Sequence, residues 1–164
     1  MNIIGIDPGK SGAVAIIDRE SHSVTLKAIT PMIKVGKSKL EYDLQGMREI
    51  LLQGSQGVQA KVFIERQQAR PGQGVSSMFT TGKGYGIWLG ICAGLQIPIE
   101  VVSPISWTKE VLRGVPGEGK GRNILGAKRL FPSEDLRKSD RARTPHDGIC
   151  DAMLIAEYGW RLSS

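Results

Sequence analysis

The first eighteen residues constrain the fold more than any other stretch of the sequence. They read MNIIGIDPGKSGAVAIID, two β-branched runs joined by a loop over residues 8–12, which predicts a β-hairpin. The first run ends at Asp7, and a carboxylate at the end of a buried strand is costly unless it is paired or binds a metal. Alternatively, Asp7 opens the turn at Pro8-Gly9, as Asx residues often do, and this stretch alone leaves both interpretations open.

The composition is typical of a globular protein. With 164 residues, 40% of them apolar, the chain is long enough for one domain spanning 1–164. Cys92 and Cys150 lie in apolar helical patterns and form no metal-binding motif, so we expect buried thiols in a reducing compartment. No targeting peptide or membrane-spanning run is evident, which predicts a cytoplasmic protein without a membrane partner. The net charge of +6 favours a polyanionic partner, usually nucleic acid, but does not by itself specify one.

A second apolar run also ends in an acid. Residues 61–65 read KVFIE, and if this strand is a parallel neighbour of the first, Glu65 lies beside Asp7 at the same end of the sheet. Two adjacent acids repel each other, so they are tolerated mainly where a cation is shared. Taken singly, Glu65 is equally consistent with an ordinary surface glutamate.

Two further acids lie near the start of a late helix over 144–158. Thr144, Pro145 and Asp147 have the spacing of an N-cap, a first helical residue and a capping-box acid, which gives Asp147 a structural explanation. Asp151 lies beyond the reach of capping and shares a helix face with Asp147. His146 is consistent with a ligand, a proton carrier or simply a polar residue at a helix start.

Together these acids form a set of hard oxygen ligands in a basic protein. Such a set favours Mg²⁺ or Mn²⁺, and two such ions about 4 Å apart can act on the attacking and leaving oxygens of a phosphodiester. The predicted metal ligands are Asp7, Glu65, Asp147 and Asp151.

The rest of the chain alternates strands and helices. We expect strands over 23–29 and 97–102, helices over 42–53, 75–95, 105–112 and 123–131, a basic loop over 34–39, a mobile Gly-rich loop over 113–122 and a charged connector over 133–143. The helix over 75–95 carries five glycines, which fits either close core packing or a subunit interface.

Basic and amide side chains in the loops are candidate DNA contacts, because most contacts to DNA go to phosphates. The loop after Glu65 contributes four of them. The Gly-rich loop, which lacks the spacing of a nucleotide-binding motif, and the helix before it contribute three more. The candidates are Lys10, Arg66, Gln67, Gln68, Arg70, Lys83, Lys109, Lys120 and Arg122.

Four motifs in order along the chain resemble one family. They are IGIDPG at 4–9, FIER at 63–66, GKGYGIWLG at 82–90 and HDGICDAMLIAEYG at 146–159. The chain resembles the RuvC-type Holliday-junction resolvases of the ribonuclease H-like superfamily, especially the phage enzymes and the related plant chloroplast resolvases. The first motif alone is weak, since actin-like ATPases begin similarly, but the ordered set is specific and covers nearly the whole chain.

The resemblance implies an α/β ribonuclease H-like fold, with a five-stranded mixed sheet whose first three strands are antiparallel and with helices on both faces. It implies a homodimer that makes paired, symmetric nicks in four-way DNA junctions and leaves 5′-phosphates. Asp7, Glu65, Asp147 and Asp151 would bind two Mg²⁺ or Mn²⁺ ions, and Lys120 would offset charge on the transition-state phosphorane. No nucleotide cofactor is implied, and the expected location is the cytoplasm of a bacterium or of a phage-infected host.

The sequence departs from the bacterial pattern in two places. Bacterial enzymes space their last two ligands three residues apart, where this chain has Gly148, so the role of Asp147 is open. Many bacterial members also have an aromatic residue soon after the strand-end glutamate that stacks on a junction base, and Gln67, Gln68 and Ala69 stand there instead.

Three other functions remain to be weighed. One is a ribonuclease H-like nuclease that acts on other branched DNA, RNA–DNA hybrids or single strands, and another is a junction-binding protein without catalysis. An actin-like nucleotide binder is disfavoured, because the chain is too short for two lobes and has no second phosphate loop.

Overall fold

The structure, a computed structural model, describes residues 1–69 and 71–163. The strands are β1 (Asn2–Asp7), β2 (Ala13–Asp18), β3 (Val24–Ile29), β4 (Met32–Val35), β5 (Lys39–Tyr42), β6 (Ala60–Glu65) and β7 (Ile99–Val102). The helices are α1 (Leu44–Ser55), α2 (Val75–Gly94), α3 (Pro104–Val111), α4 (Gly119–Leu130) and α5 (Asp147–Leu162). None of the helices in the described part of the chain is long and apolar enough to span a membrane.

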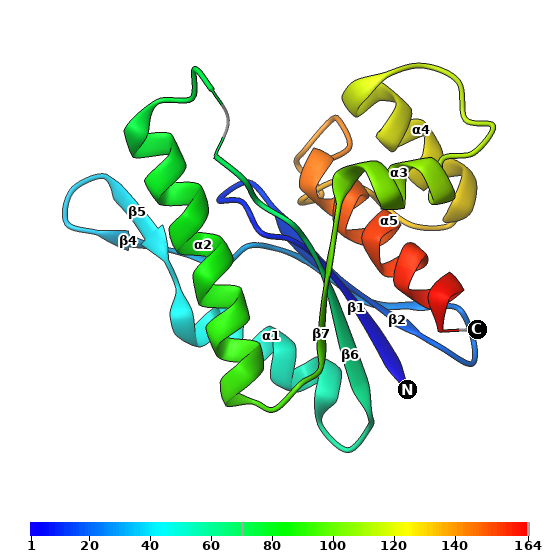
Figure 1. Cartoon of the computed structure of the whole chain (residues 1–164), viewed down its shortest axis with the longest axis horizontal. Helices are drawn as coiled ribbons and strands as arrows, with labels where there is room; N and C mark the ends of the chain where they lie inside the picture. Colours follow the sequence, from blue (N-terminus) through cyan, green and yellow to red (C-terminus); the bar gives the residue numbers. More distant parts are fainter. Residues whose placement is uncertain (70, 164) are drawn as a thin grey trace.

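Five strands form a mixed sheet in the order β3-β2-β1-β6-β7. The strands β1, β2 and β3 are antiparallel, and β6 pairs in parallel with both β1 and β7. Figure 1 shows α1 and α2 on one side of this sheet and α3, α4 and α5 on the other. The predicted five-stranded mixed sheet with helices on both faces is therefore confirmed.

The alternation of side chains along the central strands divides the core into two halves. Ile3 and Phe63 pack in the half that contains the buried residues of α3, α4 and α5. Ile4 and Ile64 pack in the half that contains Met47, Trp88 and their neighbours from α1 and α2. Because successive strand residues point to opposite faces, the odd-numbered Asp7 and Glu65 belong to the face that α5 covers.

The helix α5 packs directly on the β1–β2 hairpin. A Cβ added to Gly5 of β1 would clash with the backbone of Ala152 and Ala156, and one added to Gly148 would clash with the backbone of Ser11 and Gly12. These two close approaches require glycine, and they bring the first turns of α5 over the end of β1. The hairpin loop and the start of α5 are thereby held together.

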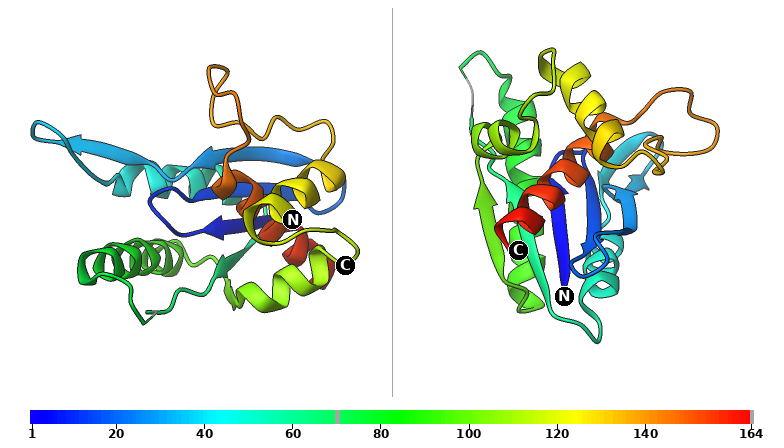
Figure 2. Two further views of the ribbon diagram at one scale, coloured as in Figure 1. Left: turned by 90° about the horizontal axis from the view of Figure 1, so that it is seen from above. Right: turned by 90° about the vertical axis from the view of Figure 1, so that its right-hand side faces the viewer.

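Residues 34–39, expected to be a basic loop, belong instead to a β-hairpin. The short strands β4 and β5 pair in an antiparallel register, and Gly36 makes the turn with φ +63°. The hairpin extends away from the main sheet (Figure 2). The prediction was wrong because lysines dominate this stretch and hide its alternation, which is only four residues long on each side.

The Gly-rich stretch 113–122 was also misjudged. The helix α4 begins at Gly119, so Lys120 and Arg122 lie in its first turns and not in a mobile loop. The remaining predicted helices and strands are found with ends that differ by a few residues. Both cysteines are buried in helices, and burial raises the pKa of Cys92 and of Cys150 to about 12, as expected for inert thiols.

Candidate active site

The parallel pairing of β1 with β6 places two acids side by side. The register pairs Ile6 with Ile64, so Asp7 and Glu65 are the next residues on the two strands and lie on the same face of the sheet. Asp7 is partly buried and accepts a hydrogen bond from the Gly9 backbone N–H. The strand pattern together with this parallel pairing thus brings two of the four predicted acids together.

The other two acids come from α5, one helical turn apart. Burial, followed by the negative charges of Asp151 and Glu65, raises the pKa of Asp7 to about 7. Burial, and then the charges of Glu65 and Asp147, raise the pKa of Asp151 to about 6, against a hydrogen bond from Asn123 that lowers it. The predicted acids therefore lie within electrostatic reach of one another, although they come from distant parts of the chain.

Each acid is held by a different donor. The indole Nε1 of Trp107 donates to Glu65 Oε2 at 2.9 Å, and Gln67 Nε2 donates to Glu65 Oε1 at 3.3 Å. Asn123 Nδ2 donates to Asp151 Oδ1 at 2.7 Å. Asp147 forms an ion pair with Lys120, in which the Nζ–Oδ2 distance is 2.5 Å.

A surface cleft of about 460 Å³ opens above Asp7, Asp147 and Asp151, and Glu65 is not part of its lining. Its walls are the β1–β2 loop, the start of α5 and the start of α4. The cleft is lined by Asp7, Gly9, Ser11, Gly12, Lys120, Thr144, Pro145, His146, Asp147, Gly148 and Asp151. A phosphate group entering it would meet three carboxylates and one lysine.

The donor set suits a hard divalent cation. Carboxylate oxygens are the side-chain ligands that Mg²⁺ and Mn²⁺ prefer, and a bound cation would relieve the repulsion that raises the pKa of Asp7. In their present positions, however, no three His, Cys, Asp or Glu side chains within residues 1–69 and 71–163 are arranged to hold a metal ion together. Asp147 is paired with Lys120, so a cation bound by this acid would require its side chain to turn away from the lysine.

The start of α5 corrects the predicted capping box. The N-cap is His146, whose Nδ1 accepts a hydrogen bond from the Ile149 backbone N–H at 3.3 Å, and Asp147 is the first helical residue. Burial, followed by the charge of Lys138, lowers the pKa of His146, which keeps Nδ1 available as an acceptor. Asp147 is therefore not the third helical residue, the position that the predicted capping box required.

Three of the predicted DNA contacts are exposed near the acids or on α3. Arg66 and Gln68 are exposed directly after β6 and line a second cavity beside the start of α3. Lys109 is exposed in the last turn of α3. Lys10, at the tip of the β1–β2 loop, donates to the carbonyl oxygen of Leu40 at 3.1 Å. Arg70 lies outside the described residues.

Two other predicted contacts have structural partners. Lys83 Nζ lies 2.7 Å from Glu41 Oε2 and ties α2 to β5. The guanidinium of Arg122 donates to the carbonyl oxygens of Leu112 and Val115, which fixes the loop between α3 and α4. Arg122 therefore has a structural role, and its contact with DNA stays a prediction.

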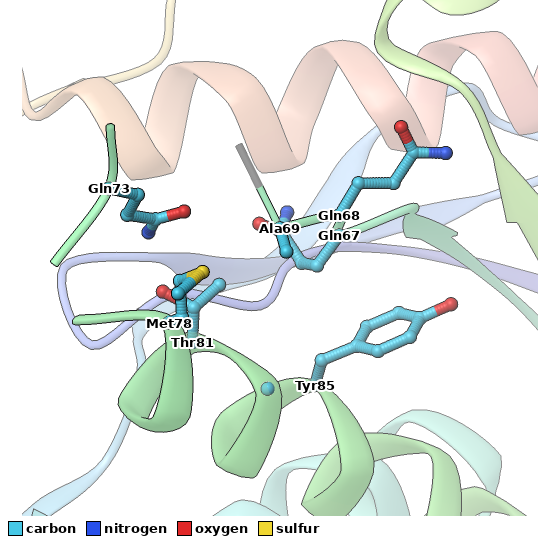
Figure 3. Close-up of a pocket in the computed structure, with 8 residues that line it drawn as sticks. Gln67, Gln68, Ala69, Gln73, Met78, Thr81 and Tyr85 are labelled. Atoms are coloured by element: carbon cyan, nitrogen blue, oxygen red, sulfur yellow. The ribbon is translucent and has the colours of Figure 1, made fainter. Parts of the chain in front are cut away.

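The loop after Glu65 forms a small cavity of about 200 Å³ with α2. Figure 3 shows Gln67, Gln68 and Ala69 on one side and Tyr85 of α2 on the other. An aromatic ring, that of Tyr85, therefore lines the cavity beside this loop, although it comes from a helix twenty residues further along the chain.

Sequence analysis missed two residues that contact the acids, Trp107 and Asn123. Both lie on helices that join β7 to α5, and neither belongs to a recognisable motif. One signal was available for Trp107, because a buried indole N–H needs an acceptor. Nothing in the sequence indicated which acceptor it would find.

The chain is similar to solved structures over nearly its whole length. It superposes on Thermus thermophilus RuvC in complex with a Holliday junction substrate with a TM-score of 0.64, at 15% identity, covering 99% of this chain and 96% of that one. A second Thermus thermophilus RuvC structure superposes with a TM-score of 0.58 at 14% identity, covering 99% of this chain and 97% of that one. The yeast mitochondrial Holliday junction resolvase superposes with a TM-score of 0.63 at 13% identity, covering 96% of this chain and 77% of that one.

The sequence itself matches no protein-family model, and no curated protein matches it. At identities of 13–15% the likeness rests on the arrangement of the elements and not on the residues. The five-stranded mixed sheet with helices on both faces is the arrangement that these superpositions match over nearly the whole chain. The chain therefore has the ribonuclease H-like fold of the RuvC-type resolvases.

Proposed function

We propose that the protein is a divalent-metal-dependent endonuclease that resolves four-way DNA junctions by paired, symmetric nicks that leave 5′-phosphates. The observation that carries the proposal is the convergence of Asp7, Glu65 and Asp151, which the parallel register of β1 and β6 and the close packing of α5 on β1 bring together. Their proximity also raises the pKa of Asp7. A cluster of acids is unfavourable in a chain of net charge +6 that binds a polyanion unless cations join it to the phosphate.

In this proposal Asp7, Glu65, Asp151 and Asp147 hold Mg²⁺ or Mn²⁺, with two ions per site. When bound, such ions activate water and stabilise charge on the leaving 3′-oxygen. Both Asp151 and Glu65 are close enough to raise the pKa of Asp7. Asp7 is therefore the acid that we assign as the ligand shared by the two ions. Lys120 is 79% exposed over the cleft and would pass from Asp147 to the phosphate when Asp147 turns to the cation.

Junction binding is assigned to basic side chains around the cleft. Arg66 and Lys10 flank the acids on the β6 and β1 sides, and Lys109 adds an exposed charge on α3. Contacts of this kind bind phosphates without reading sequence, which suits recognition of a branched DNA shape. Tyr85 faces the cavity after Glu65 and is our candidate for contact with a base.

We also propose that the protein acts as a homodimer through α2. This helix is apolar around most of its circumference, and a helix of that kind is normally buried on all sides. Yet Val75 and Phe79 are 79% and 73% exposed, and Gly82, Gly86 and Gly90 have no neighbour over their Cα atoms. A second copy of the same helix would cover this stripe, and a two-fold symmetric pair of sites would account for paired nicks.

Replacing Gly86 by Leu tests this interface. A side chain at Gly86 meets nothing within the protomer, so the variant should fold normally and gain helix propensity. It should nevertheless weaken the dimer on the order of 100-fold, about 2.7 kcal/mol, by keeping two α2 helices apart. Sedimentation velocity across a concentration series measures this. The variant Glu49→Leu, which adds an exposed Leu to α1, should remain dimeric, and an unchanged dimer for Gly86→Leu would refute the assignment.

The function is tested by cleavage of labelled substrates in Mg²⁺. Fixed and mobile four-way junctions, linear duplex, single strands and RNA–DNA hybrid are compared on denaturing gels. We expect symmetric nicks in opposed strands of the junctions and little cutting elsewhere. Preferred cutting of hybrid or single strands would identify a different nuclease on the same fold. Tight junction binding without any metal-dependent nick would identify a binding protein without catalysis.

A further inference from the structure

Two of the acids in the candidate site are held by neutral side chains that come from outside it. Trp107 donates to Glu65 at 2.9 Å, and Asn123 donates to Asp151 at 2.7 Å. A third acid, Asp147, is held differently, by an ion pair with Lys120. Glu65 and Asp151 thus each accept a hydrogen bond from an uncharged side chain, whereas Asp147 pairs with a charged one.

Uncharged donors are suited to carboxylates that must bind a cation. A lysine or arginine in their place would add a positive charge beside the cation and weaken its binding. An indole N–H or an amide N–H fixes one oxygen in space and leaves the negative charge in place. Each carboxylate oxygen can also accept more than one interaction, so a donor does not prevent an oxygen from becoming a ligand.

Both donors are themselves firmly held. Trp107 is 2% exposed and packs in the core with Val111, Leu112 and Phe131, so its ring cannot turn its N–H away from Glu65. Asn123 lies on α4, which packs against α5, the helix that carries Asp151. Figure 1 shows α3 and α4 beside α5 on the same side of the sheet. These two helices therefore connect the acid cluster to the rigid core of the protein.

We propose that Trp107 and Asn123 are positioning residues, which hold the carboxylates of Glu65 and Asp151 in the orientation that lets them share divalent cations with Asp7. The inference rests on the proposed function and adds to it a part of the site that no motif reveals. Hydrogen-bond partners behind a metal ligand typically contribute 10- to 100-fold to metal affinity.

The tryptophan substitution has a matched control in the same protein. Trp88 is as deeply buried as Trp107, and its Nε1 has no hydrogen-bond partner in the described part of the chain. It lies in the core half on the other face of the sheet. Trp107→Phe and Trp88→Phe therefore make the same change in volume at buried sites, but only the first removes a hydrogen bond to an acid.

Asn123 has a comparable control. Asn2 is the other asparagine in the chain, and its side chain donates to the carbonyl oxygen of Gly54 at 2.9 Å, at the opposite end of β1 from Asp7. Asn123→Ala and Asn2→Ala each remove one partly buried amide hydrogen bond. Thermal unfolding of all four variants measures how much each change costs in stability alone.

The test measures Mn²⁺ binding to the DNA-free protein by calorimetry and the Mg²⁺ concentration for half-maximal nicking. For Trp107→Phe and Asn123→Ala we expect roughly 10- to 100-fold weaker Mn²⁺ binding and a similar rise in the Mg²⁺ requirement. At saturating Mg²⁺ the nicking rate should recover most of its wild-type value, and junction affinity in EDTA should not change. Trp88→Phe and Asn2→Ala should match the wild type in metal affinity.

Two negative results have different meanings. If the wild type binds Mn²⁺ and nicks junctions but Trp107→Phe equals Trp88→Phe in metal affinity, the positioning role is refuted and the proposed function stands. If the wild type binds no Mn²⁺ and nicks no junction, the proposed function fails and the positioning role fails with it.

Discussion

The variant Asp7→Asn is expected to lose metal-dependent nicking of a four-way junction by at least about 10³-fold, equal to about 4 kcal/mol of activation free energy. Asp7 is the acid whose pKa is raised by both Glu65 and Asp151, so its removal takes away the ligand that the others would share. Junction affinity should remain within about twofold of wild type or increase slightly, because binding depends on lysine and arginine contacts to phosphates.

The matched control is Asp18→Asn. Asp18 also ends a strand of the same hairpin, but it pairs with Asn2 at the opposite end of the sheet. It should nick at the wild-type rate. Single-turnover nicking and gel-shift titrations in Ca²⁺ or EDTA measure the two quantities separately. Wild-type nicking by Asp7→Asn would show that the acid cluster is not the active site.

The same variant, Asp7→Asn, is expected to gain stability in the absence of metal, although it loses nicking activity. The pKa of Asp7 is raised from 3.8 to about 7 in the folded protein, so the native carboxyl holds its proton more tightly than the unfolded one. Between these two values the native state binds more protons, and the free energy of unfolding falls as pH rises. A shift of about three pKa units corresponds to at most about 4 kcal/mol, fully lost above about pH 7. Asp7→Asn should remove most of this decline, because an amide cannot ionise.

Urea unfolding in EDTA from pH 4 to pH 8 measures the effect. We expect Asp7→Asn to be more stable than the wild type at pH 8 and similar to it near pH 4. Saturating Mg²⁺ should stabilise the wild type at pH 8, by about 2.7 kcal/mol at 100 times its dissociation constant, and should leave the variant unchanged. The control Asp135→Asn should lower stability at pH 8, because Arg137 lowers the pKa of Asp135 to about 2. A wild type whose stability does not decline over this range would contradict the raised pKa of Asp7.

Together these two results would identify Asp7 as a residue kept for function at the expense of stability. A buried carboxylate near two others is unfavourable until a cation joins them. Loss of activity combined with a gain in stability is not expected of a residue that only opens the turn at Pro8, which was the alternative left open by the sequence.

The local pattern of the sequence was sufficient for the five strands of the main sheet and for the strand ends at which two acids lie. Apolar runs that end in an acid placed Asp7 and Glu65 at the ends of β1 and β6, and four-residue spacing placed Asp147 and Asp151 on one face of α5. The same kind of reasoning failed at helix starts. Thr144 was expected to cap α5, but His146 does so, because the fold of the preceding connector places the imidazole and not the hydroxyl over the first N–H groups.

Short or unusual elements were also beyond local reasoning. The strands β4 and β5 were hidden by their lysines, and α4 began earlier than its glycines suggested. In both cases contacts with distant residues outweigh weak intrinsic preference. Tyr42 of β5 donates to the carbonyl oxygen of Thr80 on α2, and Arg122 of α4 donates to the end of α3.

The sequence by itself determined which acids could meet, because apolar strand runs and helical periodicity are properties of consecutive residues. The tertiary structure alone decided what holds them. The donors Trp107 and Asn123, the pairing of Asp147 with Lys120 and the exposed stripe on α2 all depend on helices that pack from far along the chain. The direction of a buried N–H and the exposure of a helix face are set by packing between such segments, and no pattern within one segment records them.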